Sequence, residues 1–392
     1  MFVLSKFNAK KNGFVCVSTH NVFCFFYQLP KAINNMSMAN KKKLRRSNAG
    51  CVCLHGTTAF FLILSFVLTS FIAAAQNKYT YPFQNPQLDM EKRIDNIISL
   101  LTLEEKIICL GTNPTIPRLG IKGTGHIEGL HGVALGGAGN WGRRKLVATT
   151  TFCQSYGLAE TWDTALIRKV AATEAYEARC IFQSEKYNTG ALVVRAPNAD
   201  IGRYPRWGRT EECYGEDAWF NGCMAQAYVK GLQGNDPKYW MTASLMKHFL
   251  GNSNENDRVR STSDFDERLF REYYSLPFRM GVEAGSRAYM AAYNKYNGIP
   301  MMVHPVLKDI TVKEWGQNGI ICTDGRALGL LWKEHKYYPD SAWAAAAVKA
   351  GINQLLDRHT NPIKKALSDG LLKESDIDEV IRGDFRVMIK LG

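Results

Sequence analysis

Acidic residues are missing from the first 75 residues of this chain, which contain nine Lys and Arg and no Asp or Glu. An apolar run from Phe60 to Ala75 follows the basic part of this leader and ends in three alanines. A basic region, an apolar core and a small-residue end are typical of a secretory signal peptide, so we expect cleavage near Ala75 and a secreted or periplasmic protein. A start at Met36 or Met38 would place this segment at a more usual distance from the N-terminus. A membrane anchor is the alternative, although the run is slightly short for a transmembrane span.

Several chemical signatures are also missing from residues 76–392. The nine cations of the leader account for most of the formal net charge of +13, so the remainder has no basic footprint for nucleic acid. Its six cysteines form no C-x-x-C pair, and no His, Asp or Glu cluster has metal-ligand spacing. No glycine-rich loop of the phosphate-binding kind is present. We therefore expect no cofactor, no metal and no nucleic-acid partner, and membrane contact only through the signal segment. We expect most of the cysteines to be small core residues, although a periplasmic location would allow one or two disulfide bridges.

Short apolar runs alternate with helical patterns from residue 88 onward. The expected strands and helices, in chain order, are strand 191–194, helix 218–232, strand 242–246, helix 267–284, strand 288–292, helix 305–315, strand 319–322, helix 341–350, strand 354–356 and helix 375–389. Alternating elements indicate a parallel sheet, and their number favours a TIM-like (β/α)8 barrel over a doubly wound sheet. The length of residues 76–392 suits one such α/β domain, with two smaller domains as the alternative.

Polar side chains follow the expected strands at the points where the strands end. The strand at 319–322 leads into Asp324-Gly325, which by itself is also a common turn pair. In a (β/α) barrel, the carboxyl ends of the strands carry the catalytic groups. The residues at these ends supply carboxylate, guanidinium, amine, imidazole and phenol groups: Glu128, Arg209, Lys247, His248, Tyr293 and Asp324. Such a set suits a neutral polyhydroxylated ligand, because charged groups make strong hydrogen bonds to hydroxyls.

Four motifs of this chain resemble those of glycoside hydrolase family 3. The long run 197–217 is similar to the family's signature, and 247–249, 293–294 and 323–325 resemble its later motifs, in the same order. The resemblance extends from about residue 88 to the C-terminus. It implies a TIM-like barrel, often irregular in this family, and a retaining exo-β-glycosidase. The implied partner is a saccharide or aryl glycoside whose non-reducing end is a β-linked glucose or xylose.

The resemblance also implies a role for six residues. Asp324 falls on the catalytic nucleophile, which forms a glycosyl-enzyme in a retaining mechanism. The other five fall on positions that hold the sugar or lie near the nucleophile: Glu128 at the non-reducing end, Arg209, Lys247 and His248 in the −1 subsite, and Tyr293. We expect the charges of Lys247 and Arg209 to lower the pKa of Asp324 and keep it ionised.

The end of the chain departs from the family pattern. Most members continue into a second α/β domain that usually supplies the general acid/base glutamate, so we expect this domain to be absent and leave the general acid unassigned. A minority branch instead uses an Asp-His dyad on a barrel loop, but the corresponding residues 251–266 contain no histidine. Glu128 and Glu212 are acids in principle that match neither pattern. The alternative function is therefore a truncated, non-hydrolytic sugar-binding barrel, or half of a split enzyme whose partner carries the second domain.

Two further positions bear on specificity. Glu128 stands where many glucosidases have aspartate, and its extra methylene would crowd the C6 hydroxymethyl of glucose and favour a pentose by about 1–3 kcal/mol at most. Arg326 places a bulky cation two residues after Asp324, where relatives tend to have a small residue. We expect His131 and Trp207 to be structural, and Arg206, Glu216 and Asp217 to brace a loop.

Overall fold

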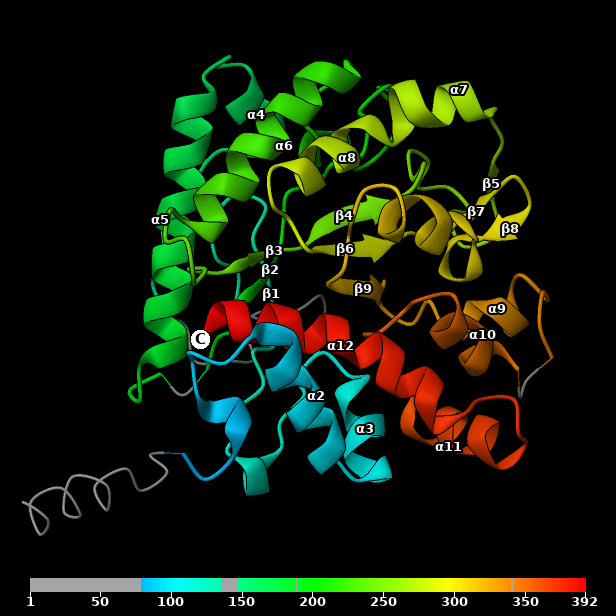
Figure 1. Cartoon of the computed structure of the whole chain (residues 1–392). Coiled ribbons are helices and arrows are strands. Elements are labelled where there is room, and N and C mark those ends of the chain that lie inside the picture. Colours follow the sequence, from blue (N-terminus) through cyan, green and yellow to red (C-terminus); the bar gives the residue numbers. More distant parts are fainter. Residues whose placement is uncertain (1–78, 136–146, 188, 340–341) are drawn as a thin grey trace, which may run out of the picture. The chain divides into compact units, whose positions relative to one another are not determined.

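Parallel strands form the centre of the fold (Figure 1). The computed structural model describes residues 79–135, 147–187, 189–339 and 342–392, all within the unit Tyr79–Gly392. The central strands are β1 (His126–Glu128), β2 (Val193–Arg195), β3 (Ala243–Ser244), β4 (Met246–Phe249), β6 (Ala288–Ala291) and β9 (Ile320–Thr323). They pair in parallel in the order β1-β2-β3 and β4-β6-β9, and only Leu245 separates β3 from β4. The strands therefore follow one another around the centre in chain order.

Isolated parallel bridges extend this arrangement. Asn198 pairs with Lys247 between the two sheets, Cys322 pairs with Gln354, and Leu355 pairs with Gly111. The described strands do not close into one continuous hydrogen-bonded ring. The architecture is the expected TIM-like barrel in an irregular form, and the expected strand at 354–356 is reduced to bridges.

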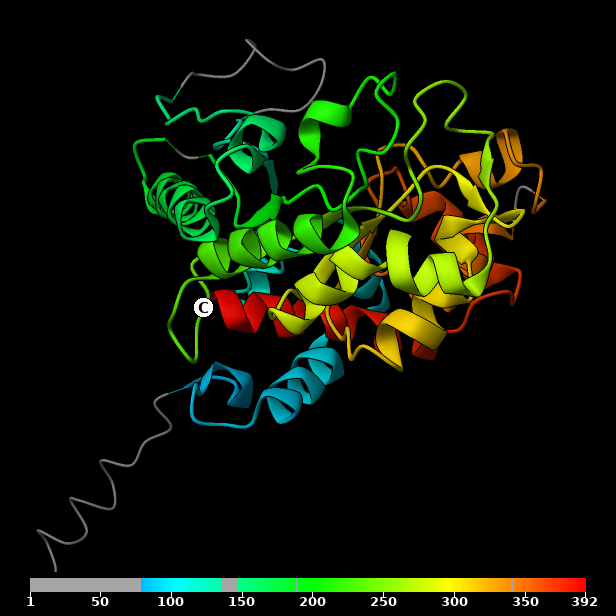
Figure 2. The same ribbon diagram turned by 90° about the horizontal axis from the view of Figure 1, so that it is seen from above.

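Helices surround the strands, and α5 and α6 lie side by side in both views (Figure 2). Their bounds are α2 Met90–Leu100, α3 Leu103–Cys109, α4 Ser155–Ala159, α5 Thr164–Gln183, α6 Ala218–Gln233, α7 Glu267–Leu269, α8 Leu276–Glu283, α9 Leu330–Lys333, α10 Trp343–Lys349, α11 Thr360–Ser368 and α12 Glu374–Leu391. A small second sheet joins β5 (Thr262–Ser263), β7 (Lys295–Tyr296) and β8 (Ile299–Pro300), and it lies to the right of the barrel strands in Figure 1.

Local sequence explains where several helices begin. The side chains of Thr102 and Glu105 form a reciprocal capping box at the start of α3. The carboxylates of Asp163 and Asp217 accept backbone N–H groups at the starts of α5 and α6. Asp217 is thus a helix cap, whereas the sequence predicted that it braces a loop.

Two expected helices are wrong in detail. The helix expected at 267–284 is divided into α7, a π-helical turn at Phe270–Tyr274, and α8. Pro277 has no N–H to donate, and the N–H of Ser275 reaches back five residues to the carbonyl of Phe270 at 2.9 Å. The helix expected at 305–315 is a π-helix over Leu307–Val312, with the same five-residue spacing from Lys313 to Lys308.

The cysteines of the described residues differ in burial. Cys109, Cys213 and Cys322 are buried, whereas Cys153 and Cys180 are exposed, and no disulfide joins any cysteine in the part of the chain that the structure describes. The expected signal segment lies outside the described residues. Among those residues, no helix is long and apolar enough to cross a membrane.

Candidate active site

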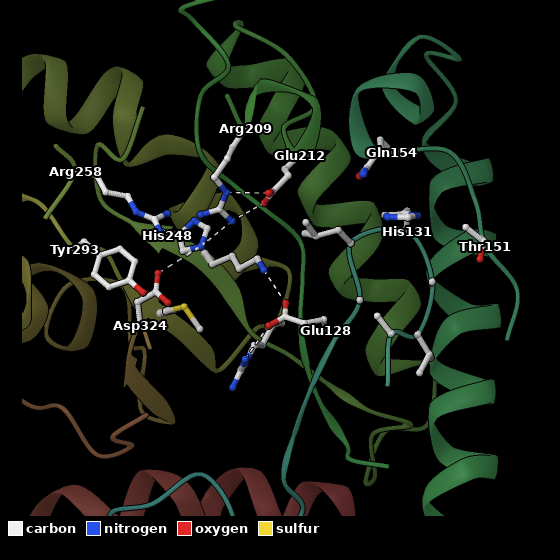
Figure 3. A pocket seen from close by; sticks show the side chains of 18 residues that line it. Glu128, His131, Thr151, Gln154, Arg209, Glu212, His248, Arg258, Tyr293 and Asp324 are labelled. Carbon is white, nitrogen blue, oxygen red and sulfur yellow. Dashed lines mark hydrogen bonds and ion pairs between the residues drawn. The ribbon is translucent and has the colours of Figure 1, made fainter. Parts of the chain in front are cut away.

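A pocket of about 460 Å³ lies at the carboxyl ends of the central strands. It contains all six residues to which the sequence gives a role: Glu128, Arg209, Lys247, His248, Tyr293 and Asp324 (Figure 3). These residues come from β1, β4, the ends of β6 and β9, and the loop after β2. The fold therefore brings together side chains that are separated by up to about half of the chain, as their positions at strand ends predicted.

Glu128 is held by two cations. Arg195 Nη1 lies 2.7 Å from Oε1 of Glu128, and Lys247 Nζ lies 2.9 Å from Oε2. Burial by itself would raise the pKa of Glu128, but the charges and hydrogen bonds of Lys247 and Arg195 outweigh it and hold that pKa at about 2. Glu128 is therefore an ionised acceptor for hydroxyl groups.

Arg209 and Glu212 form a second ion pair in the pocket wall. Arg209 Nε and Nη2 donate to the two carboxylate oxygens of Glu212 at 2.8 and 2.7 Å, which is the bidentate geometry of strong pairs. Burial opposes ionisation of Glu212, but Arg209 lowers the pKa of this carboxylate below its ordinary value. The guanidinium also lies 3.3 Å from Nε2 of His248.

His248 is buried between two aspartates. Its Nδ1 lies 2.9 Å from Oδ2 of Asp200, and its Nε2 lies 3.8 Å from Oδ2 of Asp324. Burial lowers the pKa of His248 well below its ordinary value, and the nearby charges of Arg209 and Lys247 lower it further. The ring is neutral at physiological pH.

Asp324 directly follows β9, and its side chain is 16% exposed. Its Oδ1 accepts the N–H of Gly325 at 2.6 Å, and the hydroxyl of Tyr293 beside it donates to the carbonyl of Gly325 at 2.7 Å. Burial raises the pKa of Asp324 above its ordinary value of 3.8 and outweighs the hydrogen bond from Gly325 and the charges of Lys247 and Arg209. The expected lowering of this pKa is wrong, because the desolvation of a nearly enclosed carboxylate exceeds the attraction of cations that are paired with other acids.

Sequence reasoning missed several residues of the pocket. Arg195 is the last residue of β2, so the same strand-end rule would have found it. Arg258 comes from a loop after β4, where it pairs with Glu255 at 2.6 Å and lies 4.6 Å from the centre of the Tyr293 ring. No pattern in the sequence marks Arg258. His131 lines the pocket wall, with its Nδ1 3.2 Å from the carbonyl of Phe152.

Trp207 and Arg326 do not line the pocket. Trp207 is 3% exposed, as expected for a packing residue, and its indole N–H donates to Glu255. Arg326 does not line the pocket with Asp324 but a separate groove beside it. Its backbone has a φ of 61°, so the residue after Gly325 adopts a left-handed conformation.

The carboxylates in the pocket are not equivalent as proton donors. Among the described residues, Glu128, Glu212 and Asp324 are the acids that line it. Glu128 and Glu212 are each paired with arginine or lysine, and both have lowered pKa values. Neither is suited to protonate a leaving group, which requires an acid that keeps its proton near neutral pH.

Comparison with known proteins agrees with this geometry. A family model described as the glycosyl hydrolase family 3 N terminal domain matches residues 134–386. The chain belongs to glycoside hydrolase family 3. The match confirms the family that the four motifs indicate.

The family 3 relatives include xylosidases and glucosidases. The chain is 33% identical over 332 residues to a probable β-D-xylosidase 7 of Arabidopsis thaliana, covering 80% of this chain and 43% of that protein. It is 30% identical to a β-xylosidase of Formosa agariphila, covering 84% of this chain and 46% of the relative. The chain thus spans less than half the length of these relatives.

Solved structures of family 3 share the fold. A GH3 exo-β-xylosidase in complex with a xylobiose aziridine activity-based probe superposes with a TM-score of 0.70 at 24% identity, covering 79% of this chain and 42% of that one. The β-glucosidase 3B of Thermotoga neapolitana in complex with glucose has a TM-score of 0.63 at 26% identity, covering 76% and 42% of the two chains.

Proposed function

We propose that this chain provides the substrate-binding barrel and the nucleophile of a retaining exo-β-glycosidase that acts on β-xylosides or β-glucosides. The observation that carries the proposal is the position of Asp324, which directly follows β9 and lies in a pocket lined by paired donors and acceptors for sugar hydroxyls. The relatives named as xylosidases and glucosidases support this substrate class.

In the proposed reaction, an oxygen of Asp324 attacks the anomeric carbon of the sugar. The bond from that carbon to the leaving oxygen breaks, and a glycosyl ester forms on Asp324. Water then attacks the same carbon and releases the sugar with its original configuration. His248 and Tyr293 lie on either side of the carboxylate and limit its rotation.

Glu128 supports xylose as the preferred sugar. Its carboxylate is fixed by Arg195 and Lys247, so it does not readily move away from a C6 hydroxymethyl group. We propose that the pocket accepts the pentose more readily than glucose, and that its discrimination lies within the range of about 1–3 kcal/mol that one carbon group provides.

The proton for the leaving group requires another source. Because Glu128 and Glu212 are ionised and paired, we propose that the general acid comes from polypeptide outside the described residues, either a second family 3 domain or a separate chain that carries it. General acid assistance is typically worth about 10²–10⁴-fold. Substrates with good leaving groups should therefore depend much less on it.

A trapping experiment tests the nucleophile. The purified chain is incubated with 2-deoxy-2-fluoro xylosides and glucosides that have activated leaving groups, and the label is located by intact mass and peptide mapping. We expect a glycosyl adduct on Asp324, faster with the xyloside, and no adduct in Asp324→Asn. The matched control is Asp357→Asn, which changes a carboxylate in the neighbouring groove and should still be labelled. A folded chain that binds xylose but remains unlabelled would favour the non-hydrolytic alternative.

Secretion or periplasmic location is part of the same proposal. The basic and apolar composition of residues 1–75 supports it. Expression of the full chain in a bacterial host, followed by N-terminal sequencing of the exported product, should give a start just after Ala75. Retention of the whole leader on a membrane would support the anchor instead.

A further inference from the structure

A buried carboxylate outside the pocket contacts the histidine inside it. Asp200 is 3% exposed and lies behind His248, on the side away from Asp324. Its Oδ2 accepts the backbone N–H of His248 at 3.1 Å and lies 2.9 Å from the ring Nδ1. Asp200 thus holds both the backbone and the ring of His248.

Asp200 is itself fixed by its neighbours. Its backbone N–H donates to Asn198 Oδ1 at 2.9 Å, and its carbonyl accepts from Asn221 Nδ2 at 2.7 Å. Asn198 and Asn221 are fully buried, so this support does not depend on mobile surface groups. The carboxylate therefore has a defined position relative to the ring.

The neighbours of His248 decide which ring nitrogen carries the single proton of the neutral ring. A guanidinium has only donors, and Arg209 Nη2 lies 3.3 Å from Nε2 of His248, so this contact is favourable when Nε2 has a free lone pair. On the other side, Oδ2 of Asp200 is an acceptor for Nδ1–H. Both contacts favour a proton on Nδ1.

We propose that Asp200 is a positioning residue that fixes His248 as its Nδ1–H tautomer, so that the lone pair of Nε2, which faces Arg209 in the free pocket, accepts a hydrogen bond from a substrate hydroxyl when one is bound. The opposite tautomer would point Nε2–H toward the guanidinium of Arg209, which is itself a donor. The carboxylate of Asp324 would attract that N–H, but at 3.8 Å it lies beyond hydrogen-bond distance. In the assigned tautomer, the pocket has a division of roles: Lys247 and Arg209 donate to hydroxyl oxygens, and His248 accepts a hydroxyl hydrogen. The identity of the bound hydroxyl compound rests on the proposed glycosidase function, whereas the tautomer does not.

Nitrogen NMR of the histidine rings tests the tautomer directly. The full chain is produced with labelled histidine, and long-range proton–nitrogen spectra are compared with those of His248→Gln to assign the ring. We expect a protonated Nδ1 and an unprotonated Nε2 for His248. A ring with protonated Nε2 would overturn the proposal, and this result needs no variant at Asp200.

Two variants test the role of Asp200 itself. In Asp200→Asn the NH₂ group of the new side chain can donate to Nδ1, so we expect signals of the Nε2–H tautomer to appear. Asp384→Asn changes a fully buried carboxylate on α12 that lies outside the pocket, and it should leave the His248 signals unchanged. An unchanged tautomer in folded Asp200→Asn would reduce Asp200 to a structural residue and overturn the proposal.

Kinetics separate this inference from the proposed function. With an activated aryl xyloside, Asp200→Asn should lower kcat/KM by about 10–100-fold, the effect known for metal-bound histidines that lose the partner that orients them. If the wild-type chain has the Nδ1–H tautomer but no trapping or hydrolysis, the function fails and the positioning stands. If it hydrolyses xylosides with the other tautomer, the positioning alone fails.

Discussion

Replacement of Glu174 by glutamine should stabilise the protein at neutral pH. Glu174 lies on α5 and is fully buried, and its Oε2 accepts the hydroxyl of Tyr228. That hydroxyl also lies 3.1 Å from the carbonyl of Gly129, the residue after Glu128 in the pocket wall. Oε1 of Glu174 has no hydrogen-bond partner among the described residues. The carboxyl group therefore supports the pocket wall through Tyr228, although its burial makes its charged form unfavourable.

The magnitude follows from the pKa of Glu174. Burial raises this pKa from 4.5 to about 8, despite the hydrogen bond from Tyr228. In the unfolded chain the group loses its proton near pH 4.5, so between that pH and about 8 the folded state binds one extra proton and becomes less stable as pH rises. Each pH unit costs about 1.4 kcal/mol, which gives about 3 kcal/mol at pH 7. Glutamine avoids this cost but leaves an unpaired buried amide, worth about 1 kcal/mol, so we expect a net gain of about 2 kcal/mol.

Urea denaturation of both proteins between pH 5 and pH 8 measures the effect. The difference in the free energy of unfolding should grow by about 1.4 kcal/mol per pH unit, whatever constant offset the new amide adds. Tyr228→Phe serves as the control, because loss of its hydrogen bond raises the pKa of Glu174 further and keeps the pH dependence. In the double variant, the pH dependence due to position 174 should be gone. A difference between Glu174→Gln and wild type that stays constant over this pH range would refute the reasoning.

Three further results are expected. The kcat/KM for an activated aryl xyloside should fall at low pH with an apparent pKa above 3.8, because burial raises the pKa of Asp324. Lys247→Gln should move this acidic limb of the pH profile to higher pH, because the charge of Lys247 lowers the pKa of Asp324. An acidic limb with a pKa below 3.8 would contradict the reasoning. Glu128→Asp should increase the ratio of glucoside to xyloside kcat/KM by about tenfold, since it removes one methylene near C6, and an unchanged ratio would exclude Glu128 as the determinant. Lys106→Met should lower the free energy of unfolding by about 1–2 kcal/mol, measured by urea denaturation, because Glu374 and Asp378 of α12 lose the cation that they share. In the native protein, Nζ of Lys106 lies 2.7 Å from Oε1 of Glu374 and 2.6 Å from Oδ1 of Asp378. An unchanged denaturation midpoint would show that these two ion pairs add no net stability.

Features that depend on neighbouring residues or on strand direction could be predicted from the amino-acid sequence. The capping box of Thr102 and Glu105 begins α3 because both partners lie within one helical turn. The carboxyl ends of parallel strands meet on one side of a sheet, so a carboxylate after β9 and a lysine–histidine pair on β4 were predictable as neighbours. The motifs also identified the family, which the comparisons confirm.

The tertiary structure alone decided how those groups behave. The pKa of Asp324 is the balance between the loss of solvent and the pull of cations that are already paired, and neither quantity is encoded in a local pattern. The contact between Asp200 and His248 joins residues 48 positions apart, and Arg258 enters the pocket from a loop without periodicity. Proton position, ion pairing and desolvation depend on distances through space, so they become definite only when the chain has folded around the pocket.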